Sequence, residues 1–253
     1  MENVSITVNK AIDILEVFLS KQGEVSLTEI SAATGVNVAT AHRLLSTLVR
    51  RGYLSQPEKN GRYTVGLKML DFNYAIRRNM KFLDLAYVSL SKLTKEHNQS
   101  TFLATLDADT ALIVEEVGVT EDLRINSPVG KRFPLHSTAC GKALLASLSA
   151  EERAAYYLRN PLQPVTANTV TQTTQLEGEL ADVTARGVAF DSEEYRMGLW
   201  IAAAPVYNGN GKVIAAAGIM VPTSDVNPDS VTRFATAIKS CAAKISGAIA
   251  RII

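Results

Sequence analysis

The chain is poor in the residues that build covalent or metal-linked frameworks. It contains 2 cysteines, 3 histidines and 1 tryptophan among 253 residues. Two cysteines, Cys140 and Cys241, are too few for a disulfide framework, so we expect a reducing, cytoplasmic environment. No apolar run approaches the ~20 residues that a membrane-spanning helix needs, and we find no signal peptide. We therefore expect no membrane partner.

Neither sign of charge dominates the chain. The 26 Lys and Arg residues oppose 25 Asp and Glu residues, which gives a net charge of +1. Residues 1–80 carry ten basic and seven acidic residues, a net +3, and residues 81–253 carry sixteen and eighteen, a net −2. A net positive charge in the N-terminal part is typical of an N-terminal DNA-binding domain. The length suggests one large or two ordinary domains, and the 47% of hydrophobic residues can fill real cores.

The most informative segment runs from residue 24 to residue 66. Ser26 and Glu29 have the spacing of a capping box, which starts a helix, and Gly35 suits the turn that follows it. The next helix carries an apolar stripe at helical spacing, made of Ala41, Leu44, Leu45 and Leu48. A two-stranded ribbon that ends at Gly66 completes the pattern.

The face opposite the apolar stripe carries small or basic side chains, which can approach phosphates and base edges. A helix, a turn, a second helix and a ribbon in this order place the second helix in the major groove of double-stranded operator DNA. The alternative is an ordinary helical hairpin with a solvated basic face. The candidate DNA contacts are Asn37, Ala39, Thr40, Arg43, Thr47, Arg50 and Arg62.

The rest of the chain has an α+β pattern. We expect helices over residues 8–19, 67–79, 82–97, 139–146, 150–158, 172–184 and 229–253. We expect strands over residues 101–106, 111–117, 123–127, 188–190, 201–206 and 213–221, with a hairpin turn at 208–211. Helices packed on one side of a mostly antiparallel sheet, around a cupped face, suit a small-molecule sensor.

Three segments resemble the IclR family of bacterial transcriptional regulators. They are residues 40–48 with Gly52 and Tyr53, residues 130–146, and residues 187–194 followed by Gly198 and 202–206. The resemblance covers essentially the whole chain. It implies a winged helix-turn-helix domain over 1–66, a linker helix over 67–80 and a GAF-like effector-binding domain over 81–253. It also implies a homodimer or homotetramer that responds to a small, often acidic, metabolite without any cofactor.

By position, the resemblance also implies an effector pocket. Family members that sense glyoxylate-like acids carry Cys, Ser and Ser at three positions of it. Here those positions are Ile201, Gly218 and Met220, so we expect a larger ligand with an apolar or aromatic body and one polar end. The alternative is that Ile201 and Met220 simply pack the sheet. The candidate effector-binding residues are Ala139, Cys140, Asp191, Trp200, Ile201, Gly218 and Met220.

Two further hypotheses come from the same residues. An enzyme on a GAF-like domain would use Cys140 as nucleophile and Asp191 as a base or as an orienting group, but we find no convincing triad. His136 and Cys140 are four residues apart, yet a metal needs three or four ligands, so we expect no metal site.

Assembly and operator choice have their own signals. The first helix exposes Ile12, Leu15, Val17 and Phe18 in this interpretation, which predicts a homodimer contact. Val38 and Ala39 replace the Lys and Ser usual in the family, which affects the operator sequence.

Overall fold

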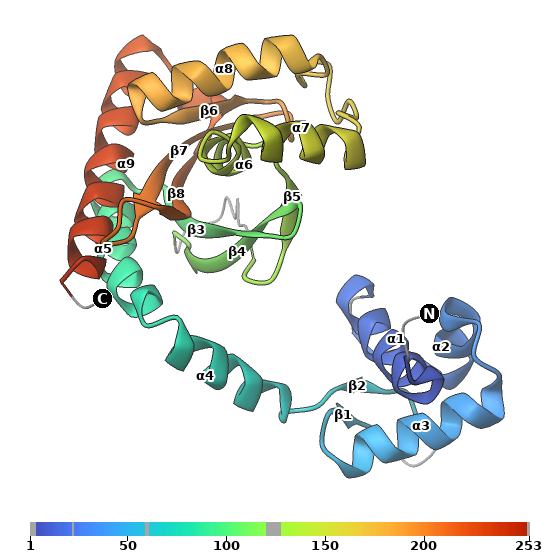
Figure 1. The fold of residues 1–253 in the computed structure, drawn as a ribbon. Coiled ribbons are helices and arrows are strands. Elements are labelled where there is room, and N and C mark those ends of the chain that lie inside the picture. Colours follow the sequence, from blue (N-terminus) through green and yellow to red (C-terminus); the bar gives the residue numbers. More distant parts are fainter. Residues whose placement is uncertain (1–3, 22, 59–60, 120–127, 252–253) are drawn as a thin grey trace. The chain divides into compact units, whose positions relative to one another are not determined.

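The computed structural model describes residues 4–21, 23–58, 61–119 and 128–251. The chain divides into two compact units, Met1–Met80 and Lys81–Ile253. Each unit has its own hydrophobic core, and Figure 1 shows the elements of both.

The N-terminal unit is a winged helix-turn-helix. Its helices are α1 (Ile6–Ser20), α2 (Leu27–Thr34), α3 (Val38–Arg50) and α4 (Met69–Asn79). Its wing is the antiparallel pair β1 (Leu54–Ser55) and β2 (Thr64–Val65). The Ser26–Glu29 capping box is present at the start of α2, and Gly35 ends that helix with a φ of 67°. The capping box and Gly35 therefore mark the start and the end of α2, as the sequence predicts.

The core of this unit corrects one expectation about α1. Val17 is buried together with Ile14 and Ile30, and Phe18 packs against the same core. Val17 is therefore not part of an exposed surface. A helix shows only one side to its neighbours, and Val17 lies on the side that meets α2 and α3.

The C-terminal unit is built on one antiparallel sheet with the strand order β5-β4-β3-β8-β7-β6. Its strands are β3 (Ser100–Asp107), β4 (Thr110–Val117), β5 (Arg132–Pro134), β6 (Ala189–Ser192), β7 (Leu199–Tyr207) and β8 (Val213–Pro222). Its helices are α5 (Phe82–His97), α6 (Ala139–Leu145), α7 (Ala150–Arg159), α8 (Thr173–Arg186), the short η1 (Thr223–Asp225) and α9 (Pro228–Ile249). This confirms the expected α+β class.

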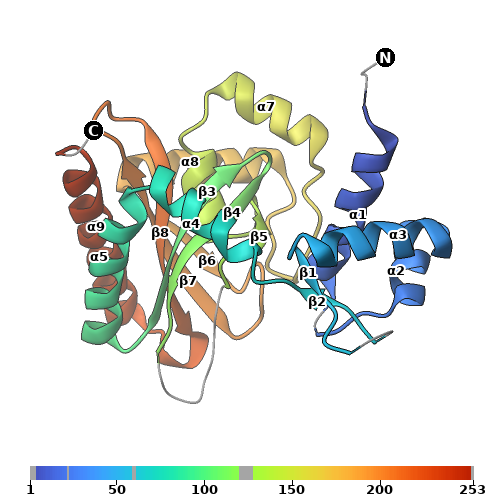
Figure 2. The same ribbon diagram turned by 90° about the horizontal axis from the view of Figure 1, so that it is seen from below.

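Helices cover both faces of this sheet. α5 and α9 contact one face, through β3, β4, β7 and β8 (Figure 2), while α6 contacts the other (Figure 1). We predicted helices on one side only. Successive side chains of a strand point to opposite faces, and the central strands are buried on both sides, so two helical layers are needed.

One predicted strand lies where no comparison can be made, and one observed strand was not predicted. The strand predicted over 123–127 lies outside the described residues. The edge strand β5, which pairs with β4 through Phe133 and Ala111, was not predicted because three residues carry no periodic signal. No helix of the described segments is long and apolar enough to cross a membrane.

Candidate DNA-binding and effector sites

α3 is held in place by its apolar stripe. Ala41 and Leu45 are fully buried in the core of the N-terminal unit. The side-chain oxygen of Asn37 caps the helix by accepting a hydrogen bond from the backbone N–H of Thr40 at 2.9 Å. Since one face packs on the core, the opposite face is left to the solvent.

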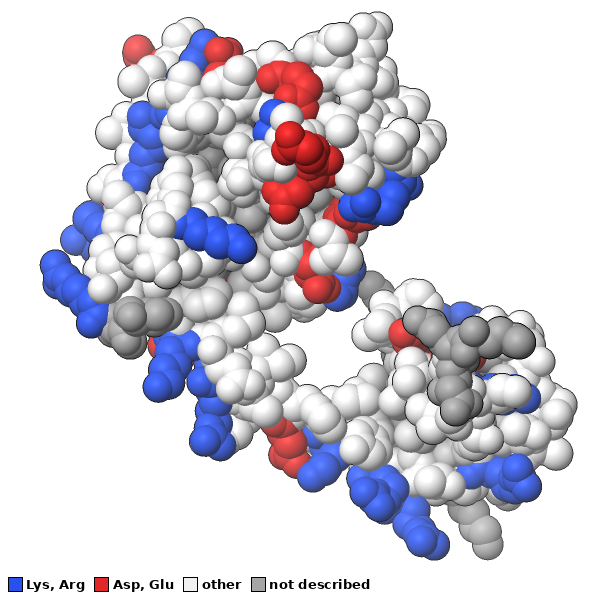
Figure 3. Space-filling view, viewed as in Figure 1, with Lys and Arg blue, Asp and Glu red and all other residues white. Residues whose placement is uncertain are grey.

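That opposite face brings together six of the seven predicted DNA contacts. Asn37, Ala39, Arg43, Thr47 and Arg50 are exposed, and Thr40 is half-buried. The hydroxyl of Thr47 donates to the carbonyl oxygen of Arg43 at 3.0 Å. Neither Arg43 nor Arg50 forms an ion pair with an acid of the described segments. Figure 3 shows basic side chains on the surface of the N-terminal unit.

Arg62, the seventh predicted contact, comes from the wing and is already paired. Its guanidinium donates to Glu29 Oε2 at 2.6 Å and to the carbonyl oxygen of Glu24 at 3.2 Å. The same Glu29 oxygen accepts from the backbone N–H of Ser26 at 2.8 Å. The Arg62 side chain is 49% exposed, so a phosphate would have to share it with Glu29.

Four of the seven predicted effector residues, Asp191, Ile201, Gly218 and Met220, lie in two rows of cross-strand partners on one face of the sheet. Asp191 pairs with Ile201, and Ile201 pairs with Met220. In the next row Gly218 of β8 lies between Ala203 and Phe102. Cross-strand partners share a face, and this is the face that α6 covers with its first residues, Ala139 and Cys140.

A cavity of about 40 Å³ opens on this face. Two residues predicted for the effector pocket, Cys140 and Ile201, line it. The other lining residues are Phe102, Ile113, Phe133 and Leu199, which are apolar, together with Thr138, Tyr195, Lys131 and Arg196. The interior is lined mainly by apolar side chains, and the charged groups at the cavity, Lys131 and Arg196, are exposed.

Trp200 does not belong to this cavity. Its ring lies 5.5 Å from the ring of Phe190 and 6.3 Å from the ring of Phe234 on α9. It therefore occupies the opposite face of the sheet from its neighbour Ile201. The alternation of side chains along a strand separates two residues that are adjacent in sequence.

Gly218 lies beneath a residue that our sequence analysis missed. A Cβ atom at position 218 would lie 2.1 Å from Cζ of Phe102. The phenyl ring therefore covers Gly218, and Phe102, not Gly218, lines the cavity. Nothing in the sequence alone indicates this contact, because the two residues meet only through the register of β3 and β8.

Asp191 is buried and stabilises the turn that follows β6. Its Oδ1 accepts hydrogen bonds from the backbone N–H groups of Glu194 at 2.7 Å and Tyr195 at 3.4 Å. Burial raises the pKa of Asp191 to about 7, and the charge of Glu194 adds to the rise, while the hydrogen bonds oppose it. This turn presents Tyr195 and Arg196 to the cavity. Asp191 therefore does not line the cavity but holds in place the turn that carries two of its lining residues.

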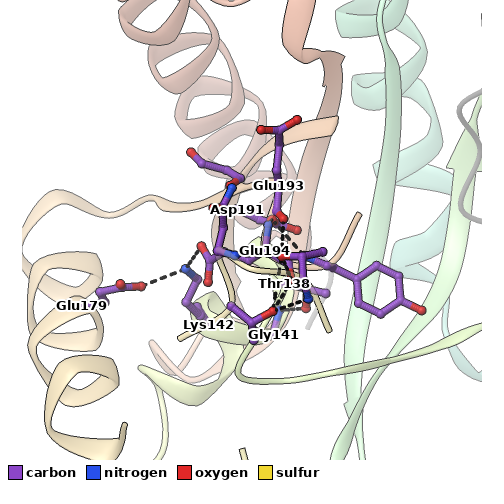
Figure 4. A network of polar contacts seen from close by, with 12 residues as sticks. Thr138, Gly141, Lys142, Glu179, Asp191, Glu193 and Glu194 are labelled. Atoms are coloured by element: carbon purple, nitrogen blue, oxygen red, sulfur yellow. Dashed lines mark hydrogen bonds and ion pairs between the residues drawn. The ribbon is translucent and has the colours of Figure 1, made fainter. Parts of the chain in front are cut away.

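A buried lysine connects the same turn to two helices (Figure 4). Lys142 of α6 donates to Glu194 Oε1 at 2.6 Å and to Glu179 Oε2 of α8 at 2.8 Å. Its side chain is only 3% exposed. Lys142 was part of the matching segment 130–146, but its partners are distant in sequence, so we assigned it no role.

The thiol of Cys140 does not have the environment of a nucleophile. Burial raises the pKa of Cys140 to about 11, and a neutral thiol reacts poorly. Nε2 of His136 lies 3.0 Å from the carbonyl oxygen of Gln163 instead of near Cys140. Both observations weigh against the enzyme hypothesis. Among the described residues no group of three or more His, Cys, Asp and Glu could hold a metal ion.

A winged helix-turn-helix unit and a sheet unit with a small cavity together define a class of protein, the ligand-responsive transcriptional regulators. The comparisons give the family. The model of the IclR helix-turn-helix domain matches residues 7–58, and the model of the bacterial transcriptional regulator IclR C-terminal domain matches residues 75–247. The chain belongs to the IclR family of bacterial transcriptional regulators, which confirms the resemblance.

Individual relatives agree over nearly the whole length. The acetate operon repressor of Salmonella typhimurium is 28% identical over 242 residues, covering 95% of this chain and 88% of that protein. The regulator XynR of Escherichia coli is 30% identical over 243 residues, covering 96% of both. The structure of an IclR homolog from Microbacterium hydrocarbonoxydans complexed with 4-hydroxybenzoate has a TM-score of 0.87, with 21% identity, and covers 98% of this chain and 100% of that one.

Proposed function

We propose that this chain binds operator DNA through α3 and that a small organic acid with an apolar or aromatic body controls this binding. The observation that carries the proposal is the cavity beside α6. Its interior is formed by apolar side chains such as Ile201 and Leu199, and two cations lie at its exposed edge.

The charges at the cavity favour an acid. Lys131 and Arg196 form no ion pair with any acid of the described segments, and Nζ of Lys131 lies 4.9 Å from the ring centre of Phe133. The first backbone N–H groups of α6, at Ala139 and Cys140, have no acceptor within the helix and suit a negatively charged oxygen. A carboxylate has two possible anchors here.

The interior favours an apolar body. Ile201 contributes methyl groups to the wall, and Phe102 covers the space beside Gly218. A very small polar acid would meet few hydrogen-bonding partners on these strands and would leave apolar surface uncovered. A single ring or a short branched chain gains dispersion from the same wall.

Calorimetry with four acids tests this choice. We expect benzoate and 4-hydroxybenzoate to bind more tightly than glyoxylate and pyruvate. 4-Hydroxybenzoate is a suitable probe because a protein of this fold holds it. Tight binding of glyoxylate to the unmodified chain would refute the apolar-body proposal, and a mobility-shift assay with operator DNA would show whether binding of the acid changes DNA affinity.

A single substitution sharpens the test. Ile201→Ser puts a hydroxyl in the apolar wall, and we expect affinity for benzoate to fall by about 5- to 150-fold, corresponding to the order of 1–3 kcal/mol for an unpaired buried polar group. Trp200→Phe is the matched control because Trp200 neighbours Ile201 on β7 but faces α9. Gly218→Ser is unsuitable, since Phe102 leaves no space for its Cβ.

We further propose that the chain acts as a homodimer or a pair of dimers. A dimer places two α3 helices in successive major grooves about 34 Å apart, so the operator is a pseudo-palindrome. Residues 67–80, which contain α4, then connect the DNA-binding domain to the effector domain. In α4, Leu70, Phe72, Tyr74 and Ile76 are all exposed, as expected for a helix that needs a partner surface.

A further inference from the structure

We propose that Phe102 and Gly218 form a coupled pair that sets the depth of the effector cavity, and that Phe102 is therefore a specificity-determining residue. The inference rests on the proposed function, because it concerns the size of the ligand that the cavity accepts. The contact between Phe102 and Gly218 can also be tested by protein stability, without any ligand.

The first observation is the contact itself. Phe102 of β3 and Gly218 of β8 are cross-strand partners. The three atoms nearest to a Cβ at position 218 are Cζ, Cε1 and Cε2 of Phe102, at 2.1, 2.4 and 2.8 Å. These are the far atoms of the phenyl ring, so the ring lies over the glycine. Phe102 is 1% exposed and lines the cavity.

The second observation is that the backbone does not require glycine here. Gly218 is not among the residues with positive φ, so any L-residue could adopt its conformation. Glycine inside a strand destabilises the strand by lost packing and higher entropy in the unfolded chain. The three atoms nearest to a Cβ at this position all belong to the Phe102 ring, so the space that the ring takes is what requires glycine here.

The third observation is the small size of the surrounding residues. Ala203 is the other partner of Gly218, while Ala104 and Ala216 pair in the neighbouring row. All three alanines are buried in the core that contains Phe102. The phenyl ring therefore fills the floor of the cavity, and the strands beneath it contribute almost no side-chain volume.

A specific consequence follows for ligand size. Removal of the ring extends the cavity down to the strand backbone at Gly218, so a longer apolar body fits. A methyl group at position 218 becomes tolerable only after the ring is gone, when it refills part of the space. The Phe102 ring thus sets the depth, and glycine at position 218 leaves the space in which the ring lies.

The first experiment is a thermal-unfolding comparison of wild type, Gly218→Ala, Phe102→Ala and the double variant. We expect Gly218→Ala to lower the midpoint of the effector unit, and the same change to leave unaltered or raise the midpoint of Phe102→Ala. If Gly218→Ala does not fold, the comparison of Phe102→Ala with the double variant suffices. A double variant that is less stable than Phe102→Ala would overturn the pairing.

Leu103→Ala is the matched control. Leu103 is fully buried next to Phe102 on β3 but points to the face that α5 and α9 cover. Its removal also leaves a cavity, so it destabilises the unit. It should not relieve the effect of Gly218→Ala, because its side chain lies on the other side of the sheet. Equal relief by Leu103→Ala would contradict a specific contact.

The second experiment tests which size of ligand the cavity accepts, with benzene, benzoate and 2-naphthoate as probes. We expect benzene to raise the unfolding midpoint of Phe102→Ala but not of wild type, and the affinity ratio of 2-naphthoate to benzoate to rise at least tenfold in Phe102→Ala. No benzene shift in Phe102→Ala, or an unchanged ratio, would refute the depth proposal. Failure of both acids to bind any variant while the benzene shift and the stability coupling persist would refute the proposed effector class alone.

Discussion

At the scale of single residues, Asp191 is a buried carboxylic acid whose surroundings disfavour its ionised form. It is 1% exposed, and burial raises its pKa to about 7. The charged groups that act on it are Glu194 in the following turn and Lys142 on α6, and Lys142 is itself paired with Glu194 and with Glu179 on α8. Because Lys142 is engaged by the two glutamates, its charge is only partly available to Asp191.

This predicts a pH-dependent stability. The folded state binds a proton at Asp191 more tightly than the unfolded chain, so the contribution is fully present below about pH 4 and is lost as pH rises through about 7. Asp191→Asn cannot ionise. We expect its free energy of unfolding, relative to wild type, to increase between pH 5 and pH 8 in urea titrations.

The control for this prediction is Asp182→Asn. Asp182 forms an exposed pair with Arg186 on α8, with its side chain 62% exposed, so the same comparison should stay flat over that range. A flat curve for Asp191→Asn as well would mean that Asp191 is ionised throughout.

Arg43 is the residue of α3 on which DNA recognition should depend most. It is exposed in the middle of the helix and unpaired with any described acid. We expect Arg43→Ala to weaken operator binding by about 1–3 kcal/mol if it contacts a base, with the fold intact because Arg43 is outside the core. Arg186→Ala, on α8, should leave operator affinity unchanged in the same mobility-shift assay. Unaltered binding by Arg43→Ala would remove it from the interface.

At the scale of elements, α1 carries a second apolar stripe besides the one that faces the core. Val8, Ile12, Leu15 and Leu19 follow one another at intervals of four, three and four residues, and of these Leu15 is half-buried and also packs against the core. Val8, Ile12 and Leu19 are exposed by 54%, 45% and 85%. This spacing is that of a coiled-coil seam, and a second copy of α1 can pair with it around a two-fold axis.

We therefore expect Ile12→Asp to shift the chain from dimer to monomer in sedimentation experiments and to weaken operator binding. A charge in the middle of an apolar seam is desolvated without a partner when two copies meet. Asp13→Ser is the matched control on the same helix, because Asp13 is exposed and outside the stripe. A dimer that survives Ile12→Asp would place the contact elsewhere. Leu15 and Phe18, which we also predicted at this contact, are poor tests because both pack against the core.

At the scale of the whole molecule, each unit has a core of its own among the described residues. The N-terminal core contains Ile14 and Leu45, and the effector core contains Leu144 and Phe102. We expect units with separate cores to unfold in separate cooperative transitions. The connecting helix α4 has no buried residue, so it adds little packing to either core.

Calorimetry tests this organisation. We expect Ile14→Ala to destabilise only the transition of the N-terminal unit, by about 2–5 kcal/mol, and Leu144→Ala to destabilise only that of the effector unit by a similar amount. Both side chains are almost fully buried, so the two variants control for one another. A single transition that moves with either variant would show that the units unfold together.

The sequence determined the local features because their causes lie within a few residues. Ser26 caps α2 with Glu29, and Asn37 caps α3 through Thr40, in each case by contacts three residues apart. The helical spacing of Ala41 and Leu45 likewise determined which face of α3 is exposed. The family resemblance predicted Asp191, Ile201 and Met220 as effector positions, and the sheet aligns these three residues in one row.

Only the tertiary structure decided what those effector positions face. Trp200 and Ile201 are adjacent in sequence, but the pleat of β7 sends them to opposite sides of the sheet. The pairing of β3 with β8 put the ring of Phe102 over Gly218, and the packing of α6 against α8 put Lys142 on Glu179. Such contacts depend on strand register and helix packing, which arise from the whole core and leave no local pattern in the chain.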